Sequence, residues 1–450
     1  MSEEALDLLG SVRRKRSEVF KQFRPDRLNG CAPADVKNVL VLDAASRSGS
    51  SFLHHLLSQH PDIISLNGEG LVFEKLQGLG LPGSEDDSDF IPEGALSSSA
   101  ISSIAEDILK DSGLLQGSGT DDGFPDDDYP SDCVQRLILQ YPEIDFSPET
   151  LLAACTEALR SGRSESTRFS TANYWLEVLE ALRRRSYAVS PAHYDLRGSD
   201  PAADFPPTSA PLPPPFKDIC LEEPPFVVPQ PRRFPDRSRL AAKTLLLKSS
   251  SNCYHMRLVK RMFPKARFKF VVLTRNPAAA VSGLMDGWLS NGFYSRNIGR
   301  LGSLAMPGYS QERLPWTTKW WNFDLPPGWA ALRGRPLEEV CAHQWASANE
   351  HILRDIGDKT IGDHLRVRYE SLLDAASLSR ELGRIFEYAG LEGPPPSDAF
   401  AAPRVMCVAP PAPQKWRKRR EVLAPLIASS RIAALAAELG YDPAGWASWT

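Results

Sequence analysis

The sequence predicts an α/β fold in which helices flank one parallel sheet that is interrupted by a long insertion. Two distant segments carry this prediction. In the first, an apolar run at residues 39–42 is followed by a turn of small residues at 46–51 and an amphipathic helix. In the second, an apolar run at 268–273 is followed by a polar turn and another helix. Strand, turn and helix in this order, repeated along a chain, are typical of a parallel sheet.

The first turn has the features of an anion-binding site. Free backbone N–H groups and the positive end of a helix dipole converge where a strand leads into a helix. Gly49 allows the backbone to approach a ligand closely, and the guanidinium of Arg47 suits phosphate or sulfate oxygens. The turn of ATP- and GTP-binding proteins ends in Gly-Lys-Ser/Thr, but here Ser50 follows the glycine. A nucleoside triphosphatase is therefore disfavoured.

The run Arg47, Ser48, Gly49, Ser50, Ser51 resembles the 5′-phosphosulfate loop of sulfotransferases that use 3′-phosphoadenosine 5′-phosphosulfate (PAPS), which reads Arg/Lys-Ser-Gly-Thr-Thr. The resemblance implies a P-loop-type fold and a donor site formed by these five residues. PAPS would be the donor substrate, and no metal would be required.

A second motif of this family matches the end of the strand at 268–273. Sulfotransferases bind the 3′-phosphate of the donor with an Arg-Asn/Asp-Pro turn, and here Arg275 is followed by Asn276 and Pro277. The family's phosphate-binding serine usually lies eight residues after the arginine. That position is Gly283 here, and Ser282 precedes it. One residue corresponds to about 100° around a helix, so Ser282 is a weaker candidate than Arg275.

Two later segments are also similar to the family. Residues 364–391 read as a strand, then Tyr369 and Glu370, then an amphipathic helix, and the resemblance places Tyr369 near the adenine. Lys415 and Arg417 lie in a Lys-Trp-Arg element like that of the carbohydrate and tyrosylprotein branches, and the family context favours at least one of them facing a donor phosphate. The resemblance covers residues 38–77, 243–290 and 341–441, and it is to a soluble, bacterial-type member of these branches.

The catalytic assignment follows from the same resemblance. Arg47 and the loop N–H groups would hold the leaving phosphate. Lys248, at the end of an apolar run, matches a family lysine that contacts the bridging oxygen. The cytosolic branch places a histidine two residues later, but this chain has Ser250. The tyrosylprotein-type branch instead uses a glutamate after the second strand, so Glu69 is the expected general base. His54 and His55 are expected to act mainly in packing.

Composition limits the remaining possibilities. The net charge of −4 gives no global field that would favour nucleic acid. The seven cysteines are scattered, and no His/Cys cluster has metal-ligand spacing. We find neither a signal-peptide h-region nor an apolar run of about 18 residues, so a cytoplasmic protein without a membrane span is expected. The sequence does not predict the oligomeric state.

Changes in composition along the chain suggest domain boundaries. We expect an N-terminal helix and linker at 1–37, the core at 38–81 and 241–450, and an inserted acidic, helical and Pro-rich cap at 82–240. Residues 82–132 hold fourteen acidic residues and one basic residue, and they are expected to be mostly loop. Helices are expected near 133–141, 148–161 and 170–186. Twelve prolines at 201–235 predict an extended strap.

A loop at 286–329 is rich in aromatic residues and suggests an aromatic wall around an apolar acceptor. Its aromatic side chains are Trp288, Phe293, Tyr294, Trp316, Trp320, Trp321, Phe323 and Trp329. The acceptor is expected to be a small or lipidic molecule from secondary metabolism that carries a hydroxyl or an amine. Two other functions stay open: a P-loop kinase or NTPase-like enzyme, and a PAPS-binding homologue without catalytic activity.

Overall fold

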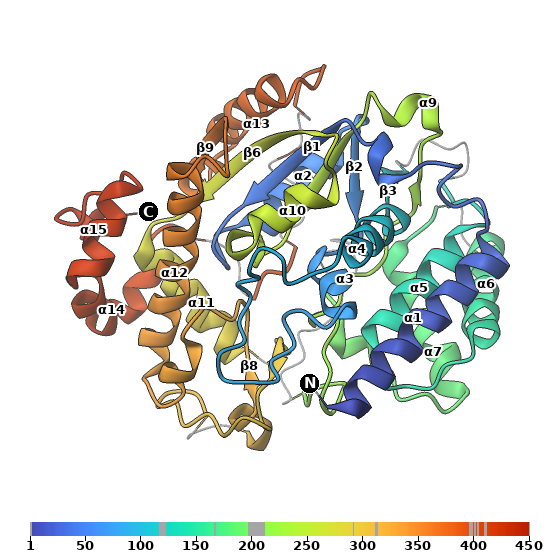
Figure 1. Ribbon diagram of the computed structural model, residues 1–450, viewed down its shortest axis with the longest axis horizontal. Coiled ribbons are helices and arrows are strands. Elements are labelled where there is room, and N and C mark those ends of the chain that lie inside the picture. The colour runs from blue at the N-terminus through green and yellow to red at the C-terminus, as the bar shows by residue number, and fades with distance from the viewer. Residues whose placement is uncertain are drawn as a thin grey trace.

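The computed structural model describes residues 2–116, 123–165, 168–196, 212–290, 292–310, 314–395, 399, 402, 405–408 and 412–449. A seven-stranded sheet with the order β4-β3-β2-β5-β1-β6-β9 lies at its centre, and helices flank it (Figure 1). The predicted fold class is therefore confirmed. The strands of the sheet are β1 (Asn38–Asp43), β2 (Ile63–Leu66), β3 (Ser112–Leu115), β4 (Arg232–Arg233), β5 (Thr244–Lys248), β6 (Arg267–Thr274) and β9 (His364–Arg368). A separate short ribbon pairs β7 (Arg296–Asn297) with β8 (Trp320–Trp321).

The helices of the N-terminal half are α1 (Glu3–Phe23), α2 (Ser50–Ser58), α3 (Leu71–Leu76), α4 (Ser98–Asp111), α5 (Tyr129–Gln140), α6 (Pro148–Glu165) and α7 (Thr171–Arg184). Those of the C-terminal half are α9 (Arg237–Leu240), α10 (Met256–Met262), α11 (Pro277–Leu289), α12 (Leu337–Gly357), α13 (Ala375–Ala389), α14 (Arg420–Ile427) and α15 (Ser430–Glu438). Helices α1, α5, α6 and α7 gather beyond the β3 side of the sheet, whereas α14 and α15 lie at the opposite side (Figure 1).

The middle of the sheet is parallel and covered on both faces. Strand β1 pairs in parallel with β5 and β6, and β2 and β9 extend this arrangement on either side. Val39 and Val41 pack into one apolar cluster, whereas Leu40 and Leu42 pack into another. Side chains of a strand alternate between faces, so β1 is apolar throughout because both of its faces are buried.

The inserted region takes part in the sheet. Strands β3 and β4 come from within residues 82–240, and β3 pairs antiparallel with β2 on one side and with β4 on the other. Helices α5, α6 and α7 fall close to the three helices expected there. The stretch 82–132, expected to be mostly loop, also contains α4, β3 and the start of α5. Helix α4 forms because Ile101, Ile104 and Ile108 fall on one face and are buried, whatever the acidity of the surrounding sequence. Part of the Pro-rich strap, 201–211, lies outside the described residues.

The parallel strands bring distant parts of the sequence to one edge of the sheet. The turn after β1 leads into α2, the turn after β6 leads into α11, and Tyr369 follows β9 directly. Lys248 is the last residue of β5, and Glu69 lies just beyond β2. In open α/β sheets, ligands bind outside the carboxyl ends of the strands. The order of the sheet therefore places the motifs that follow its strands at the edge where a site is expected.

Candidate active site

A cavity of about 320 Å³ lies at this edge and brings together most of the predicted site residues. Those that line it are Arg47, Gly49, Ser50, Ser51, Glu69, Lys248, Arg275, Ser282, Tyr369 and Lys415. Ser48 is buried behind the loop, and Arg417 lies elsewhere on the surface. Segments from both halves of the chain therefore line one cavity.

The loop between β1 and α2 is held in an unusual backbone conformation. Arg47 has a φ of 62° and Gly49 a φ of 90°, so two residues of the turn are left-handed. A side chain at Gly49 would overlap the ring of Tyr369, which packs directly against the loop. Helix α2 begins at Ser50, so its positive end faces the cavity. The loop thus has the form of an anion cradle in which Gly49 is required sterically.

The centre of the site is a small polar network around Glu69. The Lys248 ammonium donates to the Glu69 carboxylate in a very short contact, and it also donates to Ser51 Oγ at 3.1 Å. The second carboxylate oxygen, Oε2, accepts from Ser249 Oγ at 3.2 Å and from the Ser250 backbone N–H at 3.3 Å. Glu69, Lys248 and the loop are therefore in direct contact, although they come from three different segments.

Arg275 joins the second motif to the loop. Its Nη1 donates to the backbone oxygen of Arg47 at 2.8 Å, and its guanidinium lies 4.4 Å from the centre of the Tyr369 ring. The next residue, Asn276, caps α11 by accepting from Ala279 N at 2.8 Å. Its amide Nδ2 donates to Glu370 at 2.7 Å. These contacts fix the Arg275 turn against the segment after β9.

A cluster of cations contacts the middle of α11. Ser282 Oγ accepts from Arg419 at 2.9 Å, and Arg419 also donates to Asp286 at 2.7 Å. Lys415 lies 3.4 Å from the other Asp286 oxygen. By contrast, Arg417 donates to Ala447 O at 3.4 Å, away from the cavity. The arginine that reaches Ser282 is thus Arg419, which the sequence analysis did not single out.

The two histidines on α2 line the cavity as neutral groups. Burial lowers the pKa of His54 well below its usual value, and the positive charges of Lys248 and Arg232 lower it further. The pKa of His55 is lowered by burial and then by Arg232. Neither imidazole contacts the Glu69 carboxylate, whose described partners are all in the 248–250 segment.

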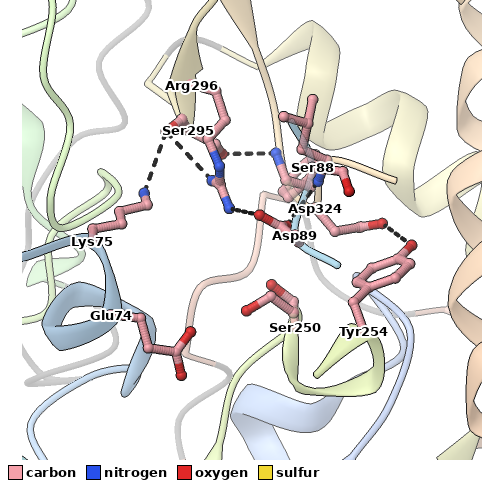
Figure 2. Close-up of polar contacts among 12 residues, drawn as sticks. Glu74, Lys75, Ser88, Asp89, Ser250, Tyr254, Ser295, Arg296 and Asp324 are labelled. Atoms are coloured by element: carbon pink, nitrogen blue, oxygen red, sulfur yellow. Dashed lines mark hydrogen bonds and ion pairs between the residues drawn. The ribbon is translucent and has the colours of Figure 1, made fainter. Parts of the chain in front are cut away.

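A buried polar network supports the loop from below. Ser46 Oγ donates to Asp324 at 2.5 Å, and the Tyr254 hydroxyl donates to the same carboxylate at 2.8 Å. Burial raises the pKa of Asp324 to about 7. Figure 2 shows the Asp324–Tyr254 contact beside the ion pair of Arg296 with Asp89, which are 2.7 Å apart. The start of the loop between β1 and α2, called the anion loop below, is therefore hydrogen-bonded to a buried carboxyl group.

Two arginines of the cavity lack an acidic partner among the described residues. Arg47 and Arg275 line it, and neither forms an ion pair with a carboxylate of the described residues. Arg47 donates instead to Met406 O at 2.8 Å, and burial is the main reason why its pKa is lowered. Two buried polar atoms of the same motifs, Ser48 Oγ and Arg275 Nε, have no hydrogen-bond partner among the described residues. Cations without an acidic partner and N–H or O–H groups without an acceptor are suited to bind phosphate or sulfate oxygens.

The aromatic loop contributes less than expected. Phe293 and Phe323 line the cavity, and the Arg47 guanidinium lies 5.4 and 5.8 Å from their ring centres. Trp288, Trp321 and Trp329 are instead buried in the apolar core. Much of the apolar wall comes from other residues, namely Leu66, Leu71, Val72, Leu115, Leu221 and Val227.

Two further observations concern the described part of the chain. No three His, Cys, Asp or Glu side chains converge there as a metal site would require. None of the helices described combines the length and the apolar character needed to cross a membrane.

No family model and no curated protein matches the chain. Among the solved structures that match the chain are three sulfotransferases. The sulfotransferase domain from the curacin biosynthetic pathway is 12% identical, with 90% of this chain and 99% of that chain covered and a TM-score of 0.36. The sulfotransferase domain of the Synechococcus PCC 7002 olefin synthase is 14% identical, with 91% and 97% covered and a TM-score of 0.37. Sulfotransferase STF9 from Mycobacterium avium is 15% identical, with 89% and 74% covered and a TM-score of 0.32. Because identity and TM-score are both low, the chemistry has to be inferred from the residues of the site.

Proposed function

We propose that this chain is a PAPS-dependent sulfotransferase that transfers the sulfuryl group to a hydroxyl or an amine of a small or lipidic acceptor. The arrangement of Glu69, Lys248 and Ser51 carries the proposal. A proton acceptor, a cation and the anion loop touch one another at the edge of the sheet. Sulfuryl transfer needs these three groups at a single point.

The residues divide the work between donor and acceptor. PAPS supplies an activated sulfuryl group whose bond to the 5′-phosphate breaks as the acceptor oxygen bonds to sulfur. Glu69 takes the proton that the acceptor hydroxyl loses in this step. Lys248 neutralises the charge that develops on the bridging oxygen, and Arg47 with the loop N–H groups holds the departing phosphate. Arg275, Ser282 and Tyr369 hold the nucleotide end.

The site is less well suited to a kinase or an NTPase. In those enzymes the loop itself carries the lysine that reaches the phosphates and a hydroxyl that holds magnesium. Here position 50 is serine, and the cation that reaches the loop comes from the neighbouring strand β5 as Lys248. A binding protein without activity would have no need for Glu69 and Lys248 to be paired beside the loop.

Binding of the product nucleotide, 3′-phosphoadenosine 5′-phosphate (PAP), tests the proposal. A ligand at one hundred times its Kd stabilises a protein by about 2.7 kcal/mol, so PAP should raise the Tm clearly. ATP with magnesium should raise it much less. Equal stabilisation by ATP, or none by PAP, would contradict the proposed donor.

A transfer screen then separates an enzyme from a binding protein. Sulfur-labelled PAPS is incubated with hydroxylated metabolites, glycolipids and carrier-bound acyl chains, and the label is followed into the product. Transfer to one class identifies the acceptor. PAP binding without transfer to any of them would favour the non-catalytic alternative.

A further inference from the structure

A buried arginine on the wall of the cavity has no role in the donor site. Arg232 of β4 is 8% exposed and lines the cavity. Its Nε donates to Asn67 Oδ1 at 3.0 Å, and its Nη1 donates to Ser65 Oγ at 2.6 Å and to Gly113 O at 3.3 Å. All three acceptors are neutral. Among the described residues its Nη2 has no hydrogen-bond partner, and this nitrogen is not fully buried.

The charge of Arg232 is therefore poorly compensated. Its pKa is lowered to about 10, mainly because the guanidinium is buried; Asp111 acts in the opposite direction, and the nearby Arg27 and Arg136 add to the lowering. No described carboxylate lies within ion-pair distance of its guanidinium. A buried charge is costly unless a partner compensates it.

The acidic side chains around this end of the cavity already have partners. Glu222 lies 2.7 Å from Arg136, and Glu223 lies 2.6 Å from Arg296. Glu69 is bound to Lys248. None of these carboxylates is left to pair with Arg232.

Arg232 shares this condition with the two donor-site arginines. Arg47 and Arg275 also line the cavity and also lack a carboxylate among the described residues. We assigned their charge to the anionic donor. By the same reasoning, Arg232 suits an anion at a second position.

The order of the sheet shows which molecule could carry that anion. From one side to the other, Arg232 lies on β4, Glu69 follows β2, the anion loop follows β1 and Arg275 follows β6. The Glu69–Lys248 centre thus separates Arg232 from the nucleotide end. A group bound at Arg232 belongs to the acceptor, with its reactive hydroxyl near Glu69.

The wall of the cavity indicates what joins these two groups. Leu71, Val72, Leu115, Leu221 and Val227 line it together with Arg232. We propose that the acceptor carries an oxyanion, a carboxylate or a phosphate, separated by an apolar segment from the hydroxyl that receives the sulfuryl group, and that Arg232 binds this oxyanion. The acceptor role rests on the proposed function, whereas oxyanion binding at Arg232 can be measured separately.

The test compares three probes of equal chain length: octanoate, octyl phosphate and 1-octanol. Their Kd values are measured by calorimetry, with and without saturating PAP, so that binding at the donor arginines is distinguished. Charge-assisted contacts of this kind correspond to roughly a tenfold to hundredfold difference in Kd. We expect the wild-type protein to prefer octanoate or octyl phosphate to octanol by such a factor. The preferred anion identifies the acceptor group as a carboxylate or a phosphate.

The variants are chosen on the same strand. Arg232→Gln should remove the preference for the anion, whereas the neighbouring Arg233→Gln should keep it, because Arg233 is exposed and pairs with Asp126 at 2.6 Å. Arg232→Lys keeps the charge and should keep a weaker preference, so it is informative if the glutamine variant does not fold. PAP binding reports whether each variant retains its site.

Some results would overturn the inference. Equal affinity of the wild-type protein for all three probes would do so, as would an unchanged preference in a folded Arg232→Gln variant. Loss of the preference in Arg233→Gln would do the same. If wild-type protein fails to bind PAP but prefers octanoate through Arg232, the donor assignment fails and the oxyanion site stands.

Discussion

Replacing Gly49 by alanine should damage both stability and donor binding, because two separate costs meet at this position. Its φ of 90° is unfavourable for any residue with a Cβ. The new Cβ would also overlap the ring of Tyr369, which is only 8% exposed and lies under Arg275. The ring cannot simply swing into solvent.

Gly94 separates these two costs. Its φ is 94°, and a Cβ there would meet nothing within 4 Å. The left-handed conformation costs an alanine about 1–2 kcal/mol, so both variants should be destabilised by this amount. Overpacking a buried site costs about 1–3 kcal/mol more, and only Gly49→Ala should be destabilised by this additional amount. We therefore expect a loss of about 2–5 kcal/mol for Gly49→Ala and about 1–2 kcal/mol for Gly94→Ala.

Urea unfolding and PAP titration measure the effect. Gly94→Ala should bind PAP like the wild-type protein, and Gly49→Ala should bind it more weakly because Tyr369 and the loop are displaced. Tyr369→Ala removes the ring, so adding Gly49→Ala to it should cost only the left-handed term. Equal destabilisation by Gly49→Ala and Gly94→Ala would refute the account of the Tyr369 contact.

Four further predictions concern the chemistry and the electrostatics. Glu69→Gln should lower turnover about 10²- to 10⁴-fold in a sulfur-transfer assay and leave PAP affinity nearly unchanged, whereas Lys248→Ala should lower both turnover and PAP affinity. Normal turnover of the Glu69→Gln variant would exclude Glu69 as the general base. Arg275→Ala should weaken PAP binding by about 1.5–3 kcal/mol in a titration, whereas Arg267→Ala should have no effect, because Arg267 is exposed at the start of β6, the strand that Arg275 follows. Transfer should survive EDTA, and loss that zinc or magnesium restores would reveal a missed metal site. His255 is ion-paired in the interior, and its pKa is raised to about 9. The ion pair should therefore contribute at most about 3 kcal/mol to the free energy of unfolding; this contribution should be complete below pH 6.5 and should fall progressively up to pH 9. In His255→Gln, the free energy of unfolding should not fall with pH over this range.

The sequence predicted the parts of the site that depend on local order. Each of the turns at Arg47 and Arg275 follows an apolar strand and precedes a helix, so their convergence follows from the parallel topology. Lys248 was singled out because it ends an apolar run that resembles the lysine-bearing strand of sulfotransferases. The role of each residue stays a prediction.

Other parts could not be predicted because they depend on helix type or on tertiary contacts. Lys415 and Lys418 both reach Asp286 because residues 415–419 form a 3₁₀ helix, in which every third residue shares a face. This period turns Arg417 away from the cavity. Arg232 lies next to a Pro-rich segment without any motif, and only the pairing of β3 with β4 brings it to the site.

The apolar period of α4 was a signal that could have been recognised. Ile101, Ile104 and Ile108 follow a helical repeat inside the acidic stretch, and all three are buried. Composition averaged over fifty residues concealed this pattern.

The two antiparallel strands from the insertion have a consequence for any attempt to shorten the protein. If residues 82–240 were excised to obtain a minimal enzyme, β2 would become the outermost strand and would lose the partner that now satisfies its backbone. A bare, apolar edge strand is a template for pairing with another chain, so the trimmed protein should self-associate rather than fold as a smaller catalyst. The inserted segment therefore also covers the edge of the sheet at β2 and protects it from pairing with another chain.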